Sequence, residues 1–161
     1  MAPCILARTD RFGLNSRVGS DFAGQGRMNY DAVKKLVHDN NRSKDYSEEF
    51  VICLIWKETN FDASAKNTAS SATGLMQLTK SAVDQVNRCS PKGIHFQFSD
   101  MTDAAKNIQC GTLYLDIAKN KLGGIDKSYG TGPGYSNSIV ACEGCLKNGQ
   151  APMVALQKIH M

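Results

Sequence analysis

Apolar residues along this chain recur at helical spacing, and no segment shows the strict alternation of apolar and polar positions that marks a half-buried strand. After Asn29, which can cap a helix, the apolar positions share one helical face until Asn40 and Asn41. These positions are Tyr30, Val33, Leu36 and Val37. Their spacing predicts a first amphipathic helix.

A second helix is predicted from Asp45, which together with Glu48 three positions later has the pattern of a capping box. Residues 50–56, Phe-Val-Ile-Cys-Leu-Ile-Trp, are apolar on every side of such a helix. Because a helix that is apolar all round is a buried one, we expect this helix at the centre of the fold.

The next segment, residues 60–73, is rich in Asn, Ser, Thr and Ala, and it predicts a surface loop. Thr79 then precedes a short predicted helix over residues 81–86. Pro91 and Gly93 mark a further connection, because both residues break regular structure.

A long amphipathic helix follows, capped by Thr102 or Asp103 and stopped by Gly123 and Gly124. Its apolar positions include Ile108, Leu115, Ile117 and Leu122. Residues 128–134, Ser-Tyr-Gly-Thr-Gly-Pro-Gly, suit neither a helix nor a strand interior. Two closing helices are predicted after them, the second with Pro152 in its first turn. The pattern as a whole predicts a mainly α fold.

The first 28 residues are rich in Arg, Gly and Ser and have no apolar period, which predicts an irregular N-terminal arm, residues 1–28, before one helical domain, residues 29–161. A length of 161 residues with 42% hydrophobic residues suits one domain with its own core. No window approaches the roughly 18 consecutive apolar residues that a bilayer crossing requires, so we expect no membrane insertion.

The charge is mildly basic: 19 basic and 15 acidic residues give a net charge of +4. The lysines are scattered along the chain, whereas nucleic-acid-binding proteins gather them in a stripe or patch. We therefore expect no nucleic acid partner. An anionic glycopolymer would suit this charge equally well.

Six cysteines, an even number, favour an oxidising compartment and predict at least one disulfide. Cys142 and Cys145 could form a redox pair, half of a zinc site or a local disulfide, and they are the easiest local pair. Cys53 and Cys110 lie in apolar helical stretches and are expected to be buried thiols. Because the chain has only three histidines and no strand-containing redox fold, we expect no metal site and no cofactor.

Glu58 follows the apolar run at the expected C-terminal end of the second helix. Desolvation disfavours a charged carboxylate, and the helix C-terminus adds partial negative charge, so both effects are expected to raise the pKa of Glu58. A carboxyl that keeps its proton near neutral pH can act as the general acid of a glycosidase. The plain alternative is a solvated glutamate at a helix end.

Four segments around Glu58 carry a resemblance to a known family. They are Glu58-Thr-Asn-Phe61, Gly74-Leu-Met-Gln77, Asn107-Ile-Gln-Cys-Gly111-Thr-Leu-Tyr114-Leu115 and Tyr129-Gly-Thr-Gly-Pro-Gly134. In order and spacing they resemble the motifs of lysozyme-like lytic transglycosylases (SLT), namely Glu-Ser-x-Phe, Gly-Leu-Met-Gln, Asn-Ile-x-x-Gly-x-x-Tyr-Leu and Ala-Tyr-Asn-Ala-Gly-Pro-Gly. The similarity covers about 100 residues, and the joint occurrence of four motifs is far more specific than any one of them.

The resemblance implies a role for each matching position. Glu58 would be the catalytic acid, Gly74, Met76 and Gln77 would line the wall of a glycan cleft, and Tyr129 would lie near Glu58. A glycine lets the backbone approach a sugar, an amide both donates and accepts hydrogen bonds, and a tyrosine hydroxyl can orient a carboxyl. Four residues of the third motif are expected to pack the long helix beneath the cleft: Asn107, Ile108, Gly111 and Leu115.

The chain departs from the family pattern at Thr59 in place of Ser, at Ser71 in place of Gly, and at Gly130 in place of the Asn that follows the tyrosine. Formation of a 1,6-anhydro end needs only one carboxyl, whereas hydrolysis with inversion needs a second one to activate water. Candidates for that second carboxylate are Asp62, Asp126 and Glu143, and Asp62 could equally cap the turn after Glu58.

From the resemblance we expect a lysozyme-like helical domain with a substrate cleft, which cleaves the β-1,4 glycan backbone of peptidoglycan. The alternatives are a glycan-binding module without turnover, an N-acetylglucosaminidase that cuts on the other side of the muramic acid, and a phage-type endolysin.

Murein lies outside the cytoplasm, whereas the chain starts with only about four apolar residues and no basic region where a secretory leader would stand. Leaderless wall-cleaving domains of this size resemble type VI secretion peptidoglycan glycoside hydrolase effectors. We therefore expect an antibacterial toxin that is secreted without a signal peptide and acts in the periplasm of target cells. A cognate immunity protein that blocks the cleft is the expected partner.

Overall fold

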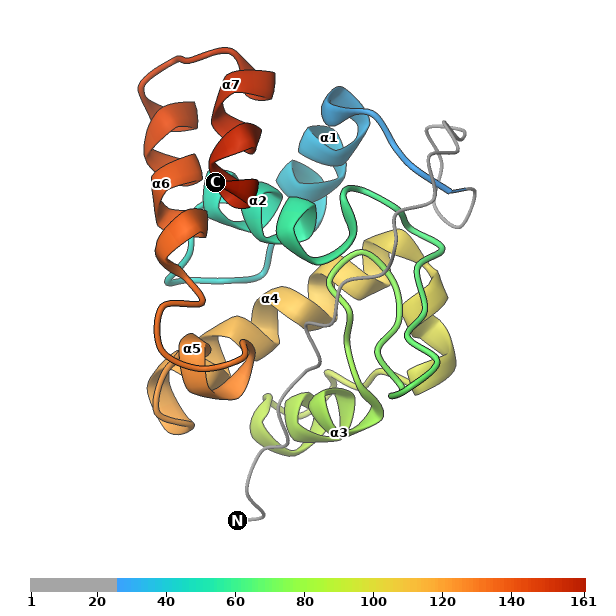
Figure 1. Cartoon of the computed structure of the whole chain (residues 1–161). Coiled ribbons are helices and arrows are strands. Elements are labelled where there is room, and N and C mark those ends of the chain that lie inside the picture. Colours follow the sequence, from blue (N-terminus) through green and yellow to red (C-terminus); the bar gives the residue numbers. More distant parts are fainter. Residues whose placement is uncertain (1–25) are drawn as a thin grey trace.

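The computed structural model describes residues 26–161 (Figure 1). Its α-helices are α1 (Tyr30–Asn40), α2 (Glu48–Thr59), α3 (Lys80–Cys89), α4 (Ala104–Lys121), α5 (Ile125–Ser128), α6 (Asn137–Lys147) and α7 (Pro152–Gln157). Two 3-10 helices span Phe98–Thr102 and Lys158–His160. The described residues form isolated β-bridges but no strand, so the predicted mainly α fold is confirmed. Most of the predicted arm, residues 1–25, lies outside the described residues.

Polar caps begin four of the helices. Asn29, Ser47, Thr79 and Asp103 each accept a hydrogen bond from the backbone N–H three positions later. The prediction that Asp45 caps the second helix is wrong, because α2 begins after Ser47. Asp45 instead accepts a hydrogen bond from Asn120 of α4 at 2.8 Å and pairs with Lys119.

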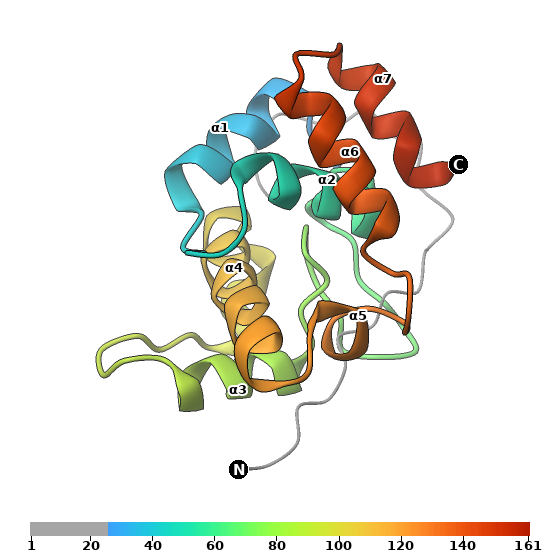
Figure 2. The same ribbon diagram turned by 90° about the vertical axis from the view of Figure 1, so that its left-hand side faces the viewer.

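Two groups of helices form the fold, and both views separate them (Figures 1 and 2). One group holds α1, α2, α6 and α7, and the other holds α3, α4 and α5. Helix α2 packs against α1 and α6, while α4 packs against α1 and α3. Residues 50–55 of α2 are all buried, as the apolar run predicts, and Trp56 is half-buried. None of the helices within residues 26–161 is long and apolar enough to cross a membrane.

The segment between α2 and α3 corrects the prediction of a surface loop. It is irregular as expected, but many of its residues are buried: Asn60, Phe61, Asp62, Ala63, Asn67, Ala72 and Thr73. Bridges join Lys66 to Thr73 and Thr73 to Leu78, so the segment folds back on itself. Its polar side chains form hydrogen bonds within the segment and do not only face water. Asn67 Oδ1, for example, accepts the Ala69 N–H at 2.8 Å.

A disulfide joins Cys53 of α2 to Cys142 of α6, 89 positions apart in sequence. This bond confirms that the chain forms at least one disulfide, but the local pair Cys142 and Cys145 is wrong, as is the prediction of a free thiol at Cys53. Helix α6 turns Cys142 inward onto α2, while Cys145 is a half-buried free thiol. Cys110 is a buried free thiol, as predicted.

Candidate active site

Glu58 lies in the last turn of α2 with only 2% of its surface exposed. The buried apolar run carries the helix through the core, and the chain then turns sharply because Asn60 and Phe61 both adopt positive φ angles, 49° and 68°. The Asn60 N–H closes the helix on the Trp56 carbonyl at 2.9 Å. A carboxyl is therefore brought into the interior at the point where the helix meets the 60–78 segment.

The Tyr135 hydroxyl donates a hydrogen bond to Glu58 Oε1. Tyr135 lies in the turn between α5 and α6, and only 5% of its surface is exposed. Lys57 Nζ lies 5.1 Å from the centre of the Tyr135 ring, a cation–π arrangement. Tyr135 is not among the residues that the sequence predicted for the site. Its one available signal was that it directly follows the Gly-Pro-Gly134 motif.

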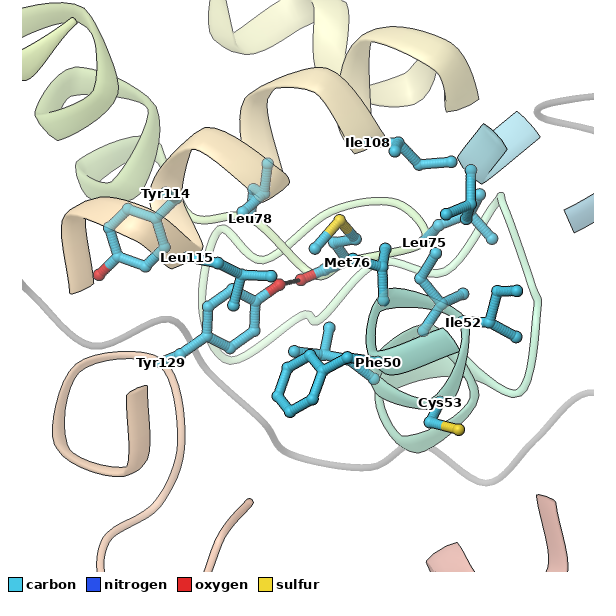
Figure 3. Packing of buried hydrophobic residues seen from close by; sticks show 14 of the residues in the cluster. Phe50, Ile52, Cys53, Leu75, Met76, Leu78, Ile108, Tyr114, Leu115 and Tyr129 are labelled. Carbon is cyan, nitrogen blue, oxygen red and sulfur yellow. Dashed lines mark hydrogen bonds between the residues drawn. The ribbon is translucent and has the colours of Figure 1, made fainter. Parts of the chain in front are cut away.

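Tyr129, which the resemblance places near Glu58, is fully buried, and its hydroxyl donates to the Met76 carbonyl oxygen (Figure 3). Burial raises the pKa of Tyr129 well above 10, and the nearby charge of Glu58 raises it further. Tyr129 therefore belongs to the same cluster as Glu58, and its ring centre lies 6.4 Å from that of Tyr135. Its hydroxyl, however, holds the segment that contains Met76.

Asn107 of α4 organises the Gly74-Leu-Met-Gln77 segment. Its Nδ2 donates to the carbonyls of Thr73 and Met101 at 2.9 and 3.0 Å, and its Oδ1 accepts the Met76 N–H at 2.9 Å. Gly74 has a φ of 79°, and a Cβ there would overlap the Asn107 amide. The structure thus explains Gly74 by close packing against α4, whereas the sequence led us to expect the close approach of a sugar there.

Met76 and Gln77 point inward as well, with no exposed surface on either residue. Gln77 Nε2 donates to the carbonyls of Ala65 and Gly74 at 3.2 and 3.0 Å. In this conformation the two side chains shape the segment from within. The predicted packing role of the third motif is also seen, since a Cβ at Gly111 would lie 2.5 Å from the Met76 sulfur.

The departures at Thr59 and Ser71 have structural uses. Thr59 Oγ1 donates to the Leu75 carbonyl at 3.0 Å, which ties the end of α2 to the segment that Asn107 holds. Ser71 Oγ accepts the Lys80 N–H at 3.0 Å, at the start of α3.

Each candidate for a second carboxylate is engaged in holding the fold. Asp62 accepts hydrogen bonds from the Ser64 N–H and hydroxyl, so it caps the turn after Glu58. Asp126 accepts the N–H groups of Gly134 and Ser136 at 3.2 and 2.9 Å. Glu143 accepts a hydrogen bond from Ser47 at 2.5 Å and pairs with Lys147 at 3.0 Å.

Two adjoining cavities of about 430 and 320 Å³ lie along the 60–78 segment. They share Lys66, Thr73 and Thr102 as lining residues. Six of their lining residues carry a hydroxyl group, which can hydrogen-bond a polar ligand such as a sugar: Ser64, Ser70, Ser71, Thr73, Ser99 and Thr102. A third cavity of about 330 Å³ lies elsewhere, between α4 and residues 93–96. Within residues 26–161, no group of three or more His, Cys, Asp and Glu side chains is placed to hold a metal ion.

Comparison with known proteins places these features in a family. The family described as "Transglycosylase SLT domain" matches residues 35–142. Two solved structures of the 70-kDa soluble lytic transglycosylase share the fold, one of the Escherichia coli protein and one of a complex with bulgecin A, at 18% and 16% sequence identity. For both structures the TM-score is 0.51, and the match covers 81% of this chain. The chain spans about a fifth of the length of those proteins. No curated protein sequence matches the chain.

Proposed function

Since the chain belongs to the Transglycosylase SLT domain family, we propose that it cleaves the β-1,4 glycan backbone of peptidoglycan with Glu58 as the general acid. The observation that carries this proposal is the buried Glu58 carboxyl at the end of α2, held by the hydroxyl of Tyr135. A carboxyl removed from water favours its neutral form, which is the form that a general acid needs.

The reaction that fits one such carboxyl is non-hydrolytic. Glu58 gives its proton to the leaving glycosidic oxygen as the bond from that oxygen to the muramyl C1 breaks. The C6 hydroxyl of the same muramyl residue then bonds to C1, and its proton returns to the Glu58 carboxylate. The product is a 1,6-anhydro end, and no water is consumed. The structural engagement of Asp62, Asp126 and Glu143 supports this route over inversion by a second carboxylate.

The substitution Glu58→Gln tests the assignment, because it keeps the shape of the side chain and removes the transferable proton. Clearing of purified sacculi should slow by roughly 10²- to 10⁴-fold. Glu49→Gln, the same change in the first turn of α2, is the matched control and should clear sacculi at the parental rate. A Glu58→Gln variant as active as the parent would show that the acid is another residue.

Mass spectrometry of the released muropeptides identifies the bond that is cut. Anhydromuramyl ends support the non-hydrolytic route, whereas reducing muramic acid ends indicate hydrolysis. Reducing N-acetylglucosamine ends indicate an N-acetylglucosaminidase. Binding of sacculi by the parental protein without any released product would instead identify a binding module.

We further propose that the enzyme acts in the periplasm of target bacteria, as an antibacterial effector delivered by type VI secretion. The disulfide between Cys53 and Cys142 supports work in an oxidising compartment, and the delivery route rests on the resemblance drawn from the sequence. A cognate immunity protein would block the site near Glu58, and an acidic partner would associate faster with a chain of net charge +4.

Expression in a host periplasm, with and without the gene adjacent to this one in the producing strain, tests this extension. Lysis that the adjacent product prevents by direct binding supports an effector with its inhibitor. Harmless expression, or lysis that the adjacent product leaves unchanged, points to a housekeeping enzyme or a phage-type endolysin.

A further inference from the structure

Tyr135 and Gly130 occupy one space beside the Glu58 carboxyl. The ring of Tyr135 fills the place that a side chain at position 130 would need, and its hydroxyl reaches Glu58. We propose that Tyr135 is the positioning residue of Glu58 and that residue 130 must be glycine to admit its ring. The catalytic part of this inference rests on the proposed function, whereas the link between Tyr135 and the Glu58 carboxyl is independent of turnover.

Glycine is required at position 130 by the space available there. Its φ angle is not in the left-handed region, unlike that of Gly132 or Gly134, so backbone conformation does not require glycine here. A Cβ built on Gly130 would come closer than 3.0 Å to Cβ, Cγ and Cδ2 of Tyr135. These atoms lie at the base of the Tyr135 side chain, so the ring could not swing aside without moving the backbone of the turn.

The turn that carries Tyr135 is held on both sides. Asp126 accepts the N–H groups of Gly134 and Ser136, the two neighbours of Tyr135. The Tyr135 N–H itself donates to the Gly132 carbonyl at 3.1 Å. On the α6 side, Lys57 donates to Ser138 at 3.0 Å and lies over the Tyr135 ring. These contacts join the turn to the end of α2, where Glu58 lies.

A hydrogen bond donated to Oε1 has two chemical consequences for Glu58. It fixes the rotation of the carboxyl and directs the acidic proton to Oε2, because an oxygen that accepts a hydrogen bond is the poorer site for a proton. It also stabilises the carboxylate that remains once the proton has passed to the glycosidic oxygen. That charge develops only in the transition state, so the interaction lowers the barrier.

The ionisable groups around Glu58 allow the sign of the effect to be worked out. Tyr135 donates to its carboxyl, Tyr129 interacts with its charge, and Lys57, the preceding residue, lies over the Tyr135 ring. Tyr129 stays neutral at any working pH because its pKa is raised above 10. A donated hydrogen bond favours the charged carboxylate, so its removal should raise the pKa of Glu58 and move the alkaline limb of the activity profile to higher pH.

The first test compares Tyr135→Phe with Tyr114→Phe. Tyr114 is a buried tyrosine whose hydroxyl donates to the Ser128 carbonyl at 3.2 Å, so it is a matched control for the loss of one buried hydroxyl. Carbon-13 NMR of the Glu58 side-chain carboxyl gives its ionisation midpoint without any turnover. We expect Tyr135→Phe to raise this midpoint by about one to two pH units, the size of one hydrogen bond to a charged group. The kcat on sacculi should fall about 10- to 100-fold.

An unchanged midpoint in Tyr135→Phe, or an equal shift in Tyr114→Phe, would overturn the proposal. The NMR result also separates the two inferences. A shifted midpoint in a protein that releases no muropeptides would support the role of Tyr135 and refute the proposed function.

The second test is Gly130→Ala, with Gly144→Ala in α6 as the control, since a Cβ at Gly144 meets nothing within 4 Å. Gly130→Ala should shift the Glu58 midpoint as far as Tyr135→Phe does. The double variant should shift it no further, because both changes remove one and the same interaction. A Gly130→Ala protein with the parental midpoint, or a double variant with additive shifts, would refute the coupling. If Gly130→Ala does not fold, Tyr135→Phe still decides the role of Tyr135.

Discussion

Glu58 and Tyr135 are 77 positions apart and meet because each ends up at the boundary between two elements. Glu58 is carried there by the buried helix α2, and Tyr135 by the turn that precedes α6. Tyr129 belongs to the fourth family motif, but its hydroxyl donates to the Met76 carbonyl. At the scale of single residues, the role of each tyrosine therefore depends on which polar group its hydroxyl reaches.

Cys110 offers a prediction at the same scale. Burial raises the pKa of its thiol to about 12, with a smaller contribution from the charge of Asp100. Only the thiolate reacts with alkylating reagents, and a raised pKa keeps the thiol neutral at pH 8. We expect Cys110 to remain unmodified in the folded protein, while the half-buried Cys89 and Cys145 react.

Peptide mass spectrometry after timed treatment with iodoacetamide measures the modification of each cysteine. Denaturation before treatment is the control, and it should make all three thiols react. Modification of Cys110 at the rate of Cys145 in the folded protein would contradict its burial.

At the scale of elements, Asn107 shows how α4 determines the shape of a segment that has no regular structure of its own. Its amide makes three hydrogen bonds to the backbone of residues 73, 76 and 101, and all three lie in the interior. Gly74 leaves the space in which this amide fits. The segment beside Glu58 is therefore ordered by a helix that follows it in the chain.

Asn107→Ala should destabilise the protein by about 3 kcal/mol or more, because it leaves buried backbone groups without partners. Asn120→Ala is the control in the same helix, since the hydrogen bonds of Asn120 are exposed. Urea denaturation measures the free energy of unfolding of both variants. A loss for Asn107→Ala no greater than that for Asn120→Ala would show that the amide does not hold the segment.

The disulfide is the other contact between elements that carries a prediction. It closes a loop of 89 residues and joins α2, which bears Glu58, to α6. Replacement of Cys53 and Cys142 by Ala should lower the free energy of unfolding by about 4 to 5 kcal/mol on the chain-entropy account of a loop of that length. Chemical denaturation of the double variant tests this loss of stability, with Cys145→Ala, which removes only a free thiol, as the control. Equal denaturation midpoints for the two proteins would contradict the expected stabilisation.

At the scale of the whole molecule, the net charge of +4 bears on the proposed encounter with the cell wall. The peptide stems of peptidoglycan carry free carboxylates, which attract a cationic protein. Dissolved salt screens this attraction. Because the Debye length falls from about 10 Å at 0.1 M salt to about 3 Å at 1 M, binding of Glu58→Gln protein to sacculi should weaken over this range.

Co-sedimentation with sacculi measures this binding without turnover, and a short neutral glycan serves as the control ligand. Binding to sacculi that is unchanged or stronger at high salt would show that the net charge makes no contribution to the encounter.

Several features followed from the sequence because they depend on neighbours only a few positions away. The start of α1 at Asn29, the burial of α2 and the end of α4 at its glycines all depend on caps and apolar periods within one or two helical turns. The position of Glu58 at the end of a buried helix followed from the same local pattern. The four motifs, found in the expected order, predicted the family.

Tertiary structure alone decided which groups meet across long stretches of chain. Cys142 pairs with Cys53 rather than with Cys145 three positions away, and the hydroxyl that reaches Glu58 is that of Tyr135, which follows the motif, and not that of Tyr129 within it. Gly130, a departure from the motif, makes room for the Tyr135 ring. Such contacts depend on how separate helices pack and how the turns between them are held. Residues distant in sequence are brought together by that packing, which no local period or spacing encodes.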